Sequence, residues 1–104
     1  MSDAFRTVAR VGEIPAGGSR VYYLDDVAIA VFWIGGEYYA IEDICTHDGG
    51  PLADGELDGC IIECPRHGAK FDLKTGAVVA LPASAPVPTY AVRVLGDEIQ
   101  VGWS

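Results

Sequence analysis

Both histidines of this chain lie within three residues of a cysteine, and thiolates and imidazoles are residue types that bind metals together. The two pairs are Cys45-x-His47 and Cys64-x2-His67. The short spacing within each pair lets a sulfur and a ring nitrogen from one turn approach a common centre, and two such turns supply four ligands. These four residues are the candidate metal site.

Two kinds of centre accept two sulfurs and two ring nitrogens: a tetrahedral zinc ion, or a two-iron cluster with thiolates on one iron and imidazoles on the other. Structural zinc sites commonly place both cysteines in one turn and both histidines on a following helix. Here each turn supplies one ligand of each type, and no segment has a helical pattern. The order favours the two-iron centre, with Cys45 and Cys64 on one iron and His47 and His67 on the other. A structural zinc-binding adaptor is the alternative of another class.

The scaffold that must hold these turns has the periodicity of β-strands, because short runs of β-branched and aromatic residues alternate with Gly, Asp and Pro. The predicted strands are Phe5–Val11, Arg20–Leu24, Val27–Ile34, Glu37–Glu42, Cys60–Glu63, Ala69–Asp72, Ala77–Ala80, Tyr90–Leu95 and Glu98–Trp103. Gly35-Gly36 suits a tight hairpin turn. The strand pattern lapses over Thr46–Gly59 and over Leu81–Pro88, which contains three prolines. We expect an all-β sandwich or barrel whose loops carry the chemistry.

The charge and composition of the chain limit the classes of partner that it is expected to bind. The chain has 104 residues and a formal charge of −8, a sign that repels nucleic acids and anionic membranes and suits a partner with a basic docking patch. The first residues do not form a cationic segment before an apolar stretch, and no run approaches the ~18 apolar residues of a membrane span. We therefore expect a cytoplasmic protein. Three cysteines, an odd number, favour metal binding over a disulfide framework.

Flanking residues around both pairs sharpen this interpretation. C-T-H at Cys45–His47 and C-P-x-H-G at Cys64–Gly68 closely resemble the Rieske-type [2Fe-2S] ferredoxins of bacterial ring-hydroxylating oxygenase systems. The resemblance continues through Gly49–Leu52, Phe71-Asp72, Thr75-Gly76 and the proline loop Pro82–Pro88. It implies a Rieske-type antiparallel β fold with one [2Fe-2S] cluster and a proline loop that shields it. The expected organisation is a single Rieske domain over 1–104, with a cluster-binding insertion over roughly 43–72.

The same resemblance implies a soluble one-electron carrier that passes electrons from a flavin-containing reductase to a terminal oxygenase. We expect a monomer that docks transiently with these partners. The chain has no room for a flavin or nicotinamide domain, no G-x-G-x-x-G and no ligand set for a catalytic iron, so it is not expected to be an enzyme by itself. The alternatives within electron transfer are the small subunit of an assimilatory nitrite reductase and a Rieske protein serving iron-sulfur cluster assembly.

The reduction potential is expected at the low end of the Rieske range. Two imidazoles in place of two thiolates make the oxidised cluster less negative, which places Rieske centres at roughly −150 to +300 mV against about −400 mV for plant-type ferredoxins. High-potential Rieske proteins add a disulfide and hydroxyl donors to the cluster sulfurs. The matching positions in this chain are Gly50, Arg66, Ala69 and Phe71, which supply neither.

The remaining residues of interest have simpler interpretations. Cys60 lies in an apolar run and is expected to be a buried small hydrophobe. Arg66 is either a solvated charge or an aid to docking. Packing within the sheet is expected for the aromatic residues Tyr22, Tyr23, Phe32, Trp33, Tyr38 and Tyr39. A solvated face, with docking as the alternative, is expected for the acidic residues Asp43, Asp48, Asp54, Glu56 and Asp58.

Overall fold

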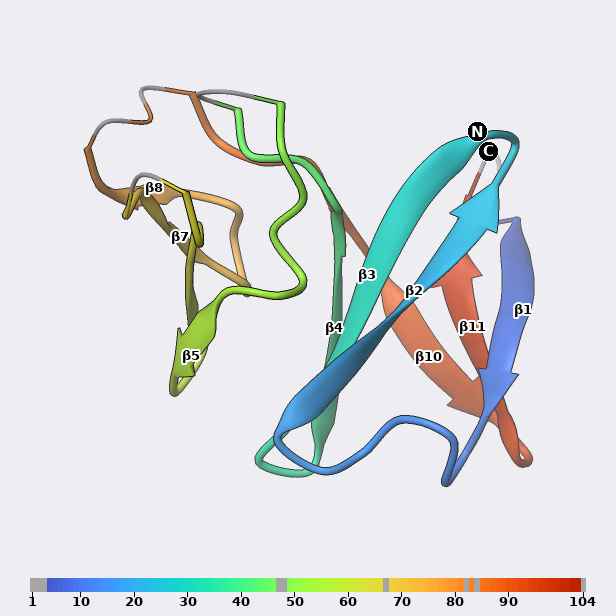
Figure 1. Ribbon diagram of the computed structural model, residues 1–104. Helices are drawn as coiled ribbons and strands as arrows, with labels where there is room; N and C mark the ends of the chain where they lie inside the picture. Colours follow the sequence, from blue (N-terminus) through green and yellow to red (C-terminus); the bar gives the residue numbers. More distant parts are fainter. Residues whose placement is uncertain (1–3, 47–48, 67, 82, 84, 104) are drawn as a thin grey trace.

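The computed structural model describes residues 4–46, 49–66, 68–81, 83 and 85–103, and these residues form strands and no helix (Figure 1). No helix that could cross a membrane therefore occurs in this part of the chain. The strands are β1 (Phe5–Arg10), β2 (Gly18–Leu24), β3 (Val27–Ile34), β4 (Glu37–Glu42), β5 (Glu56–Asp58), β6 (Ile61–Glu63), β7 (Lys70–Asp72), β8 (Val78–Ala80), β9 (Thr89–Tyr90), β10 (Val92–Leu95) and β11 (Glu98–Gly102). The all-β prediction is confirmed.

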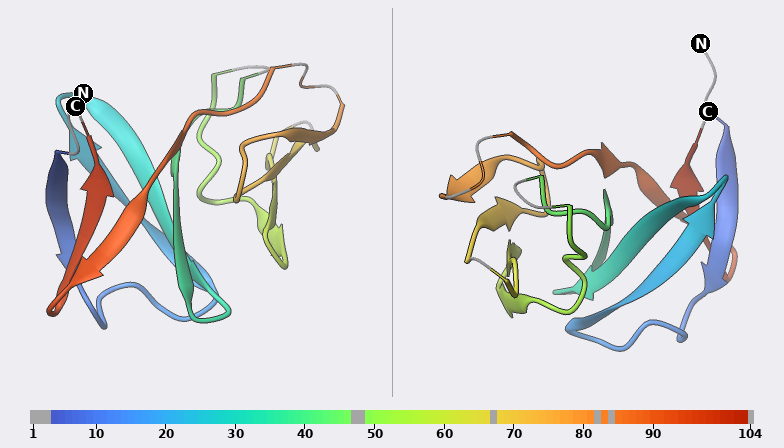
Figure 2. Two further views of the ribbon diagram at one scale, coloured as in Figure 1. Left: turned by 180° about the vertical axis from the view of Figure 1, so that it is seen from behind. Right: turned by 45° about the horizontal axis from the view of Figure 1, so that its top comes forward.

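These strands form three antiparallel sheets. The terminal sheet has the order β1-β11-β10, the central sheet β2-β3-β4-β9, and the small sheet β5-β6-β7-β8. Figures 1 and 2 show the small sheet on one side of the central sheet and the terminal sheet, with both chain ends, on the other. The central sheet is thus the layer that joins the two halves of the molecule.

Strand β3 shows why the central sheet can serve both sides. Its sequence is apolar throughout, as expected for a strand buried on both faces. Because side chains alternate along a strand, Ile29 and Val31 face a core shared with Ile99 of the terminal sheet. Ala30 and Phe32 face the second core, which contains the small sheet. These four side chains are fully buried.

Two tight turns connect the first three strands of the central sheet. Gly35 and Gly36 join β3 to β4 with φ of 62° and 84°, which confirms the predicted hairpin of two left-handed residues. Asp25 and Asp26 join β2 to β3 in the same way, with φ of 50° and 70°. The Asp25 carboxylate accepts a hydrogen bond from Trp103 Nε1 (2.9 Å) and faces Arg6. Both contacts lower the pKa of Asp25, the bond from Trp103 having the larger effect.

Apart from shifts of one or two residues at strand ends, the structure corrects the strand prediction in two places. Strand β5 lies inside the predicted lapse Thr46–Gly59, because pairing with β6 outweighs the weak strand pattern of its own Glu-Leu-Asp sequence. The predicted strand Tyr90–Leu95 is divided at Ala91, where the chain leaves the central sheet and enters the terminal sheet. A change of sheet partner does not alter the local hydrophobic periodicity, so the sequence pattern predicted one continuous strand.

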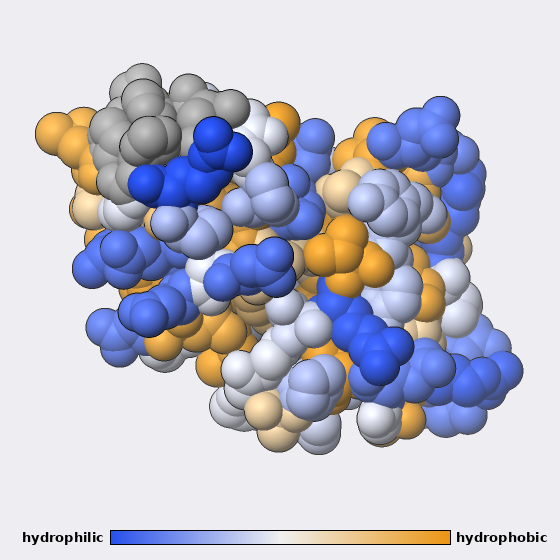
Figure 3. Space-filling view, viewed as in Figure 1, coloured by the Kyte–Doolittle hydropathy of each residue, from blue (hydrophilic) through white to orange (hydrophobic). Residues whose placement is uncertain are grey.

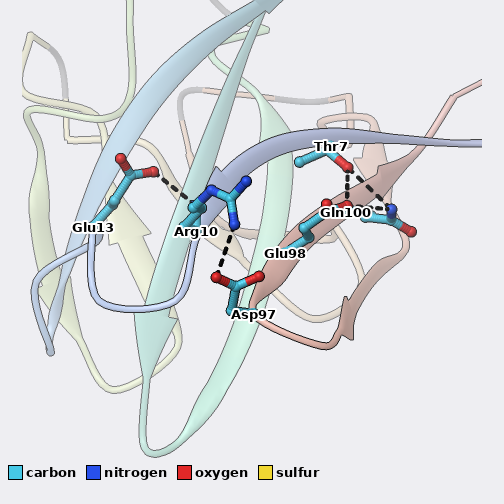
Figure 4. Close-up of polar contacts among 6 residues, drawn as sticks. All are labelled: Thr7, Arg10, Glu13, Asp97, Glu98 and Gln100. Carbon is cyan, nitrogen blue, oxygen red and sulfur yellow. Dashed lines mark hydrogen bonds and ion pairs between the residues drawn. The ribbon is translucent and has the colours of Figure 1, made fainter.

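A polar network stabilises the outer side of the terminal sheet (Figure 4). Gln100, which is 9% exposed, donates from Nε2 to Thr7 Oγ1 (3.0 Å) and Glu98 Oε1 (3.2 Å). Its Oε1 accepts a hydrogen bond from Arg93 Nε (2.7 Å). Arg10 and Asp97 form a separate ion pair at 2.8 Å, with both side chains more than half exposed.

We predict that Gln100→Ala lowers the stability of the fold by about 1–2 kcal/mol, because three hydrogen bonds of a buried amide are lost. For a chain of this size that corresponds to a decrease of roughly 4–16 °C in the midpoint of thermal unfolding. Circular dichroism melting at a fixed scan rate measures it. Arg10→Gln is the matched control and should melt like the wild type, since its ion pair is solvated. An equal decrease in melting temperature in both variants would contradict a stabilising role for the Gln100 hydrogen bonds.

Candidate metal centre

The two candidate sulfur ligands are buried in the same hydrophobic core. Cys45 follows the end of β4 and is 0% exposed, and Cys64 directly follows β6 and is 1% exposed. Neither forms a disulfide. The same core contains Leu52, Ile62, Ala69, Phe71, Ala83 and Val87, which come from the small sheet and from the loops around it. The fold therefore brings together two cysteines that are distant in sequence.

The first ligand loop runs from Cys45 to Gly50 and is closed by two backbone hydrogen bonds. Cys45 N donates to Gly50 O (2.6 Å), and Gly49 N donates to Cys45 O (2.7 Å). Gly49 has a φ of 77°, a left-handed conformation that glycine adopts without the strain of a Cβ. The loop thus turns the chain back on itself around the cysteine.

The second ligand loop, Cys64 to Ala69, repeats this geometry. Cys64 N donates to Ala69 O (2.6 Å), Gly68 N donates to Cys64 O (3.1 Å), and Gly68 has a φ of 79°. In both loops the cysteine N–H donates to the carbonyl of the residue five positions later. The cysteine carbonyl accepts a hydrogen bond from a left-handed glycine four positions later. Two loops of one design, each beginning with a buried cysteine, are what a centre held from two sides requires.

His47 and His67 lie outside the described residues. By sequence each belongs to one of the two closed loops, between a cysteine and its left-handed glycine. The described residues by themselves contain no group of three or more metal-binding side chains. The assignment of His47 and His67 as nitrogen ligands remains a prediction. The donors that are described fit an iron-sulfur centre, because a buried thiol in apolar surroundings becomes a stable thiolate when a metal ion neutralises its charge.

The proline loop packs on the same core as the cysteines. Ala83 and Val87 are 0% and 2% exposed and belong to that core. Thr46 Oγ1, one residue after Cys45, donates to Ala85 O (2.6 Å). At the other end of the loop, Val87 N donates to Gly76 O (2.9 Å). The described part of the loop is therefore fixed to the first ligand loop through Ala85 and to the turn after β7 through Val87.

The acidic side chains near the site divide into two groups. Asp54, Glu56 and Asp58 are exposed, as expected for a solvated face, and Asp48 lies outside the described residues. Asp43 departs from that expectation, because its partly buried carboxylate accepts two backbone hydrogen bonds.

An open depression of about 400 Å³ lies beside the second ligand loop. Its lining residues are Asp54, Gly55, Glu56, Glu63, Cys64, Pro65 and Gly68.

Cys60 is partly exposed, so the prediction of a buried residue is wrong in degree, although the side chain packs against the cysteine core. It contacts Tyr39, whose pKa is raised to about 12 by burial, by the Cys60 thiol and by Glu37.

The prediction that the aromatic residues pack within the sheet holds for Phe32, which is fully buried, but not for Tyr23, which is 72% exposed. Trp33 and Tyr38 stack across β3 and β4, with ring centroids 5.5 Å apart.

Comparison with known proteins decides the family. The family model of the Rieske [2Fe-2S] domain matches residues 4–91. The chain belongs to the Rieske [2Fe-2S] domain family. Its Rieske domain is 43% identical over 90 residues to the 3-phenylpropionate/cinnamic acid dioxygenase ferredoxin subunit of Escherichia coli K12, covering 86% of this chain and 84% of that protein.

Solved structures agree with this assignment. The ferredoxin of carbazole 1,9a-dioxygenase from Nocardioides aromaticivorans IC177 superposes with a TM-score of 0.89 at 35% identity, over 94% of this chain and 96% of that one. A ferredoxin in a complex of reduced oxygenase and oxidized ferredoxin of carbazole 1,9a-dioxygenase superposes with a TM-score of 0.88 at 32% identity, over 97% and 94%. The Rieske-type fold, the single [2Fe-2S] cluster and the role of an electron carrier are thereby confirmed.

Proposed function

We propose that Cys45, His47, Cys64 and His67 are the four ligands of the cluster. The observation that carries this assignment is the identical hydrogen-bonding design of the two loops, each of which begins with a buried cysteine. The chemistry that the cluster supplies when bound is the uptake and release of one electron. The protein's own residues hold the thiolates in an apolar core, and the proline loop covers that core.

We further propose that the carrier takes electrons from a flavin-containing reductase and delivers them to a terminal ring-hydroxylating oxygenase. The names of the relatives support this choice over a nitrite reductase subunit or a cluster-assembly protein. The net charge of −8 supports docking against basic surfaces. Val79 in β8 and Leu81 just after it are 52% and 78% exposed and directly precede the proline loop. Figure 3 shows hydrophobic surface at the outer end of the small sheet. Such a surface suits transient contact next to the cluster.

The organisation of the chain is part of this proposal. Residues 1–104 form a single domain, and the cluster-binding insertion extends over roughly 43–72. Both ligand loops and strands β5, β6 and β7 fall within that range, which supports the proposed limits. We place the protein in the cytoplasm, as a monomer that binds each partner in turn.

Electron paramagnetic resonance of the reduced protein tests the proposed function. We expect one unpaired spin per chain and a midpoint potential near the low end of the Rieske range. His47→Cys or His67→Cys should lower that potential by roughly 100–250 mV, towards the value of four-cysteine clusters. Reduction by a flavin-containing reductase should slow as ionic strength rises, because salt screens attraction between exposed charges. A zinc-loaded protein without a spin signal would contradict the proposal.

A further inference from the structure

The two ligand loops are built alike but are closed at their bases by different means. The second loop is a hairpin between β6 and β7, and its ends are held by the strand pairs Glu63↔Lys70 and Ile62↔Phe71. The first loop follows β4, and the returning chain at 51–55 is not a strand. Some other interaction must therefore close the base of the first loop.

The two loops also differ in sequence at the corresponding positions. Counted from each cysteine, Pro51 stands where Lys70 stands in the second loop, and Leu52 stands where Phe71 stands. Because Cys64 N donates to Ala69 O, the next hydrogen-bonded pair of the second ladder is Ile62↔Phe71. Asp43 occupies the position that corresponds to Ile62, the ladder partner of Phe71.

The side chain of Asp43 replaces the missing ladder. Its Oδ1 accepts hydrogen bonds from Leu52 N at 2.7 Å and from Ala53 N at 2.8 Å. The backbone N of Asp43 donates to Ala28 O (2.8 Å), which fixes the residue to the end of the central sheet. Leu52 is fully buried in the cysteine core, so its N–H would otherwise lack a partner away from water. Bonds to an ionised acceptor are about twice as strong as those between neutral groups.

We propose that Asp43 is a positioning residue whose carboxylate clasps the first ligand loop and thereby holds Cys45 in register with Cys64. The clasp joins the two ends of the segment that contains Cys45 and His47. The role in cluster geometry rests on the proposed ligand set. The clasp itself rests only on the contacts of Asp43 with Leu52 and Ala53.

Three variants of the purified, cluster-loaded protein test the clasp. Asp43→Ala removes both hydrogen bonds, and Asp43→Asn keeps an oxygen that can accept them without the charge. Asp54→Ala removes the charge of an exposed carboxylate one residue beyond Ala53 and is the matched control. We expect Asp43→Ala to lose its visible absorption about 10- to 100-fold faster in the presence of an iron chelator. Asp43→Asn should stay within about threefold of the wild type, and Asp54→Ala should equal it.

Two further measurements separate positioning from general stability. The paramagnetic resonance spectrum of the cluster that remains in Asp43→Ala should broaden, because the first loop takes several conformations, while Asp43→Asn restores the wild-type line shape. Hydrogen exchange by mass spectrometry on wild type and Asp43→Asn should show protected amides at Leu52 and Ala53, whether or not Asp43→Ala folds. This exchange result does not depend on which residues bind the cluster.

The proposal is overturned if the Leu52 and Ala53 amides of the wild type exchange as fast as an exposed loop. It is also overturned if Asp43→Ala matches Asp54→Ala in chelation rate and line shape, since the carboxylate would then have no effect on the loop. If Asp43→Asn fails as fully as Asp43→Ala, charge rather than hydrogen-bond acceptance is responsible, and the clasp is wrong as stated.

Discussion

Cys45→Ser and Cys64→Ser are each expected to remove the cluster almost completely. The wild type should contain about two irons and two acid-labile sulfides per chain, and each variant close to none. Serine is nearly the same size as cysteine, so the core should tolerate it, but its hydroxyl is a far poorer ligand for iron than a thiolate. Iron and sulfide analysis after anaerobic preparation and reconstitution measures the loss.

Cys60→Ser is the internal control, because Cys60 is a free thiol of the same chain that lies outside both ligand loops. It should retain full iron and sulfide content. The three variants also separate folding from ligation: far-ultraviolet circular dichroism should report a similar strand content for all three if only the metal is lost. Loss of iron in Cys60→Ser, or its retention in Cys45→Ser, would contradict the proposed sulfur ligands.

Sequence reasoning placed the strands well where hydrophobic patterns are long and turn residues are distinctive. Val27–Ile34 and Glu37–Glu42 were predicted with the bounds that the structure gives, because both strands bury continuous apolar residues around a Gly-Gly turn. Strand β5 was missed because its three residues include two acids, and only pairing with β6 defines it. The strength of a three-residue strand lies in its partner, which local sequence does not contain.

The site shows the same division. The cysteine spacing and the flanking Gly and Pro residues are local signals, and they were sufficient to predict two ligand loops. The Asp43 carboxylate gave no such signal, because its backbone partners at Leu52 and Ala53 are nine and ten residues away and any acidic loop would look alike.

Adding hydroxyl donors near the sulfurs is expected to raise the reduction potential. Ala69 and Phe71 are fully buried in the core that contains both cysteines, at the positions where high-potential Rieske proteins carry hydroxyls. A hydroxyl there donates more strongly to the reduced cluster, which bears one more negative charge. If the difference is about 1–2 kcal/mol per bond, Ala69→Ser and Phe71→Tyr should each raise the potential by roughly 40–90 mV, since 59 mV corresponds to a factor of ten for one electron.

Redox titration followed by visible spectroscopy measures both shifts, and the double variant tests whether they add. Ala40→Ser is the matched control: Ala40 is equally buried, but it belongs to the other core, between the central and terminal sheets. Its hydroxyl should cost stability without moving the potential. A rise in Ala40→Ser equal to that in Ala69→Ser would mean that buried hydroxyls act through the fold as a whole. If neither Ala69→Ser nor Phe71→Tyr raises the potential, then Ala69 and Phe71 do not adjoin the cluster sulfurs, and the low potential would need another cause.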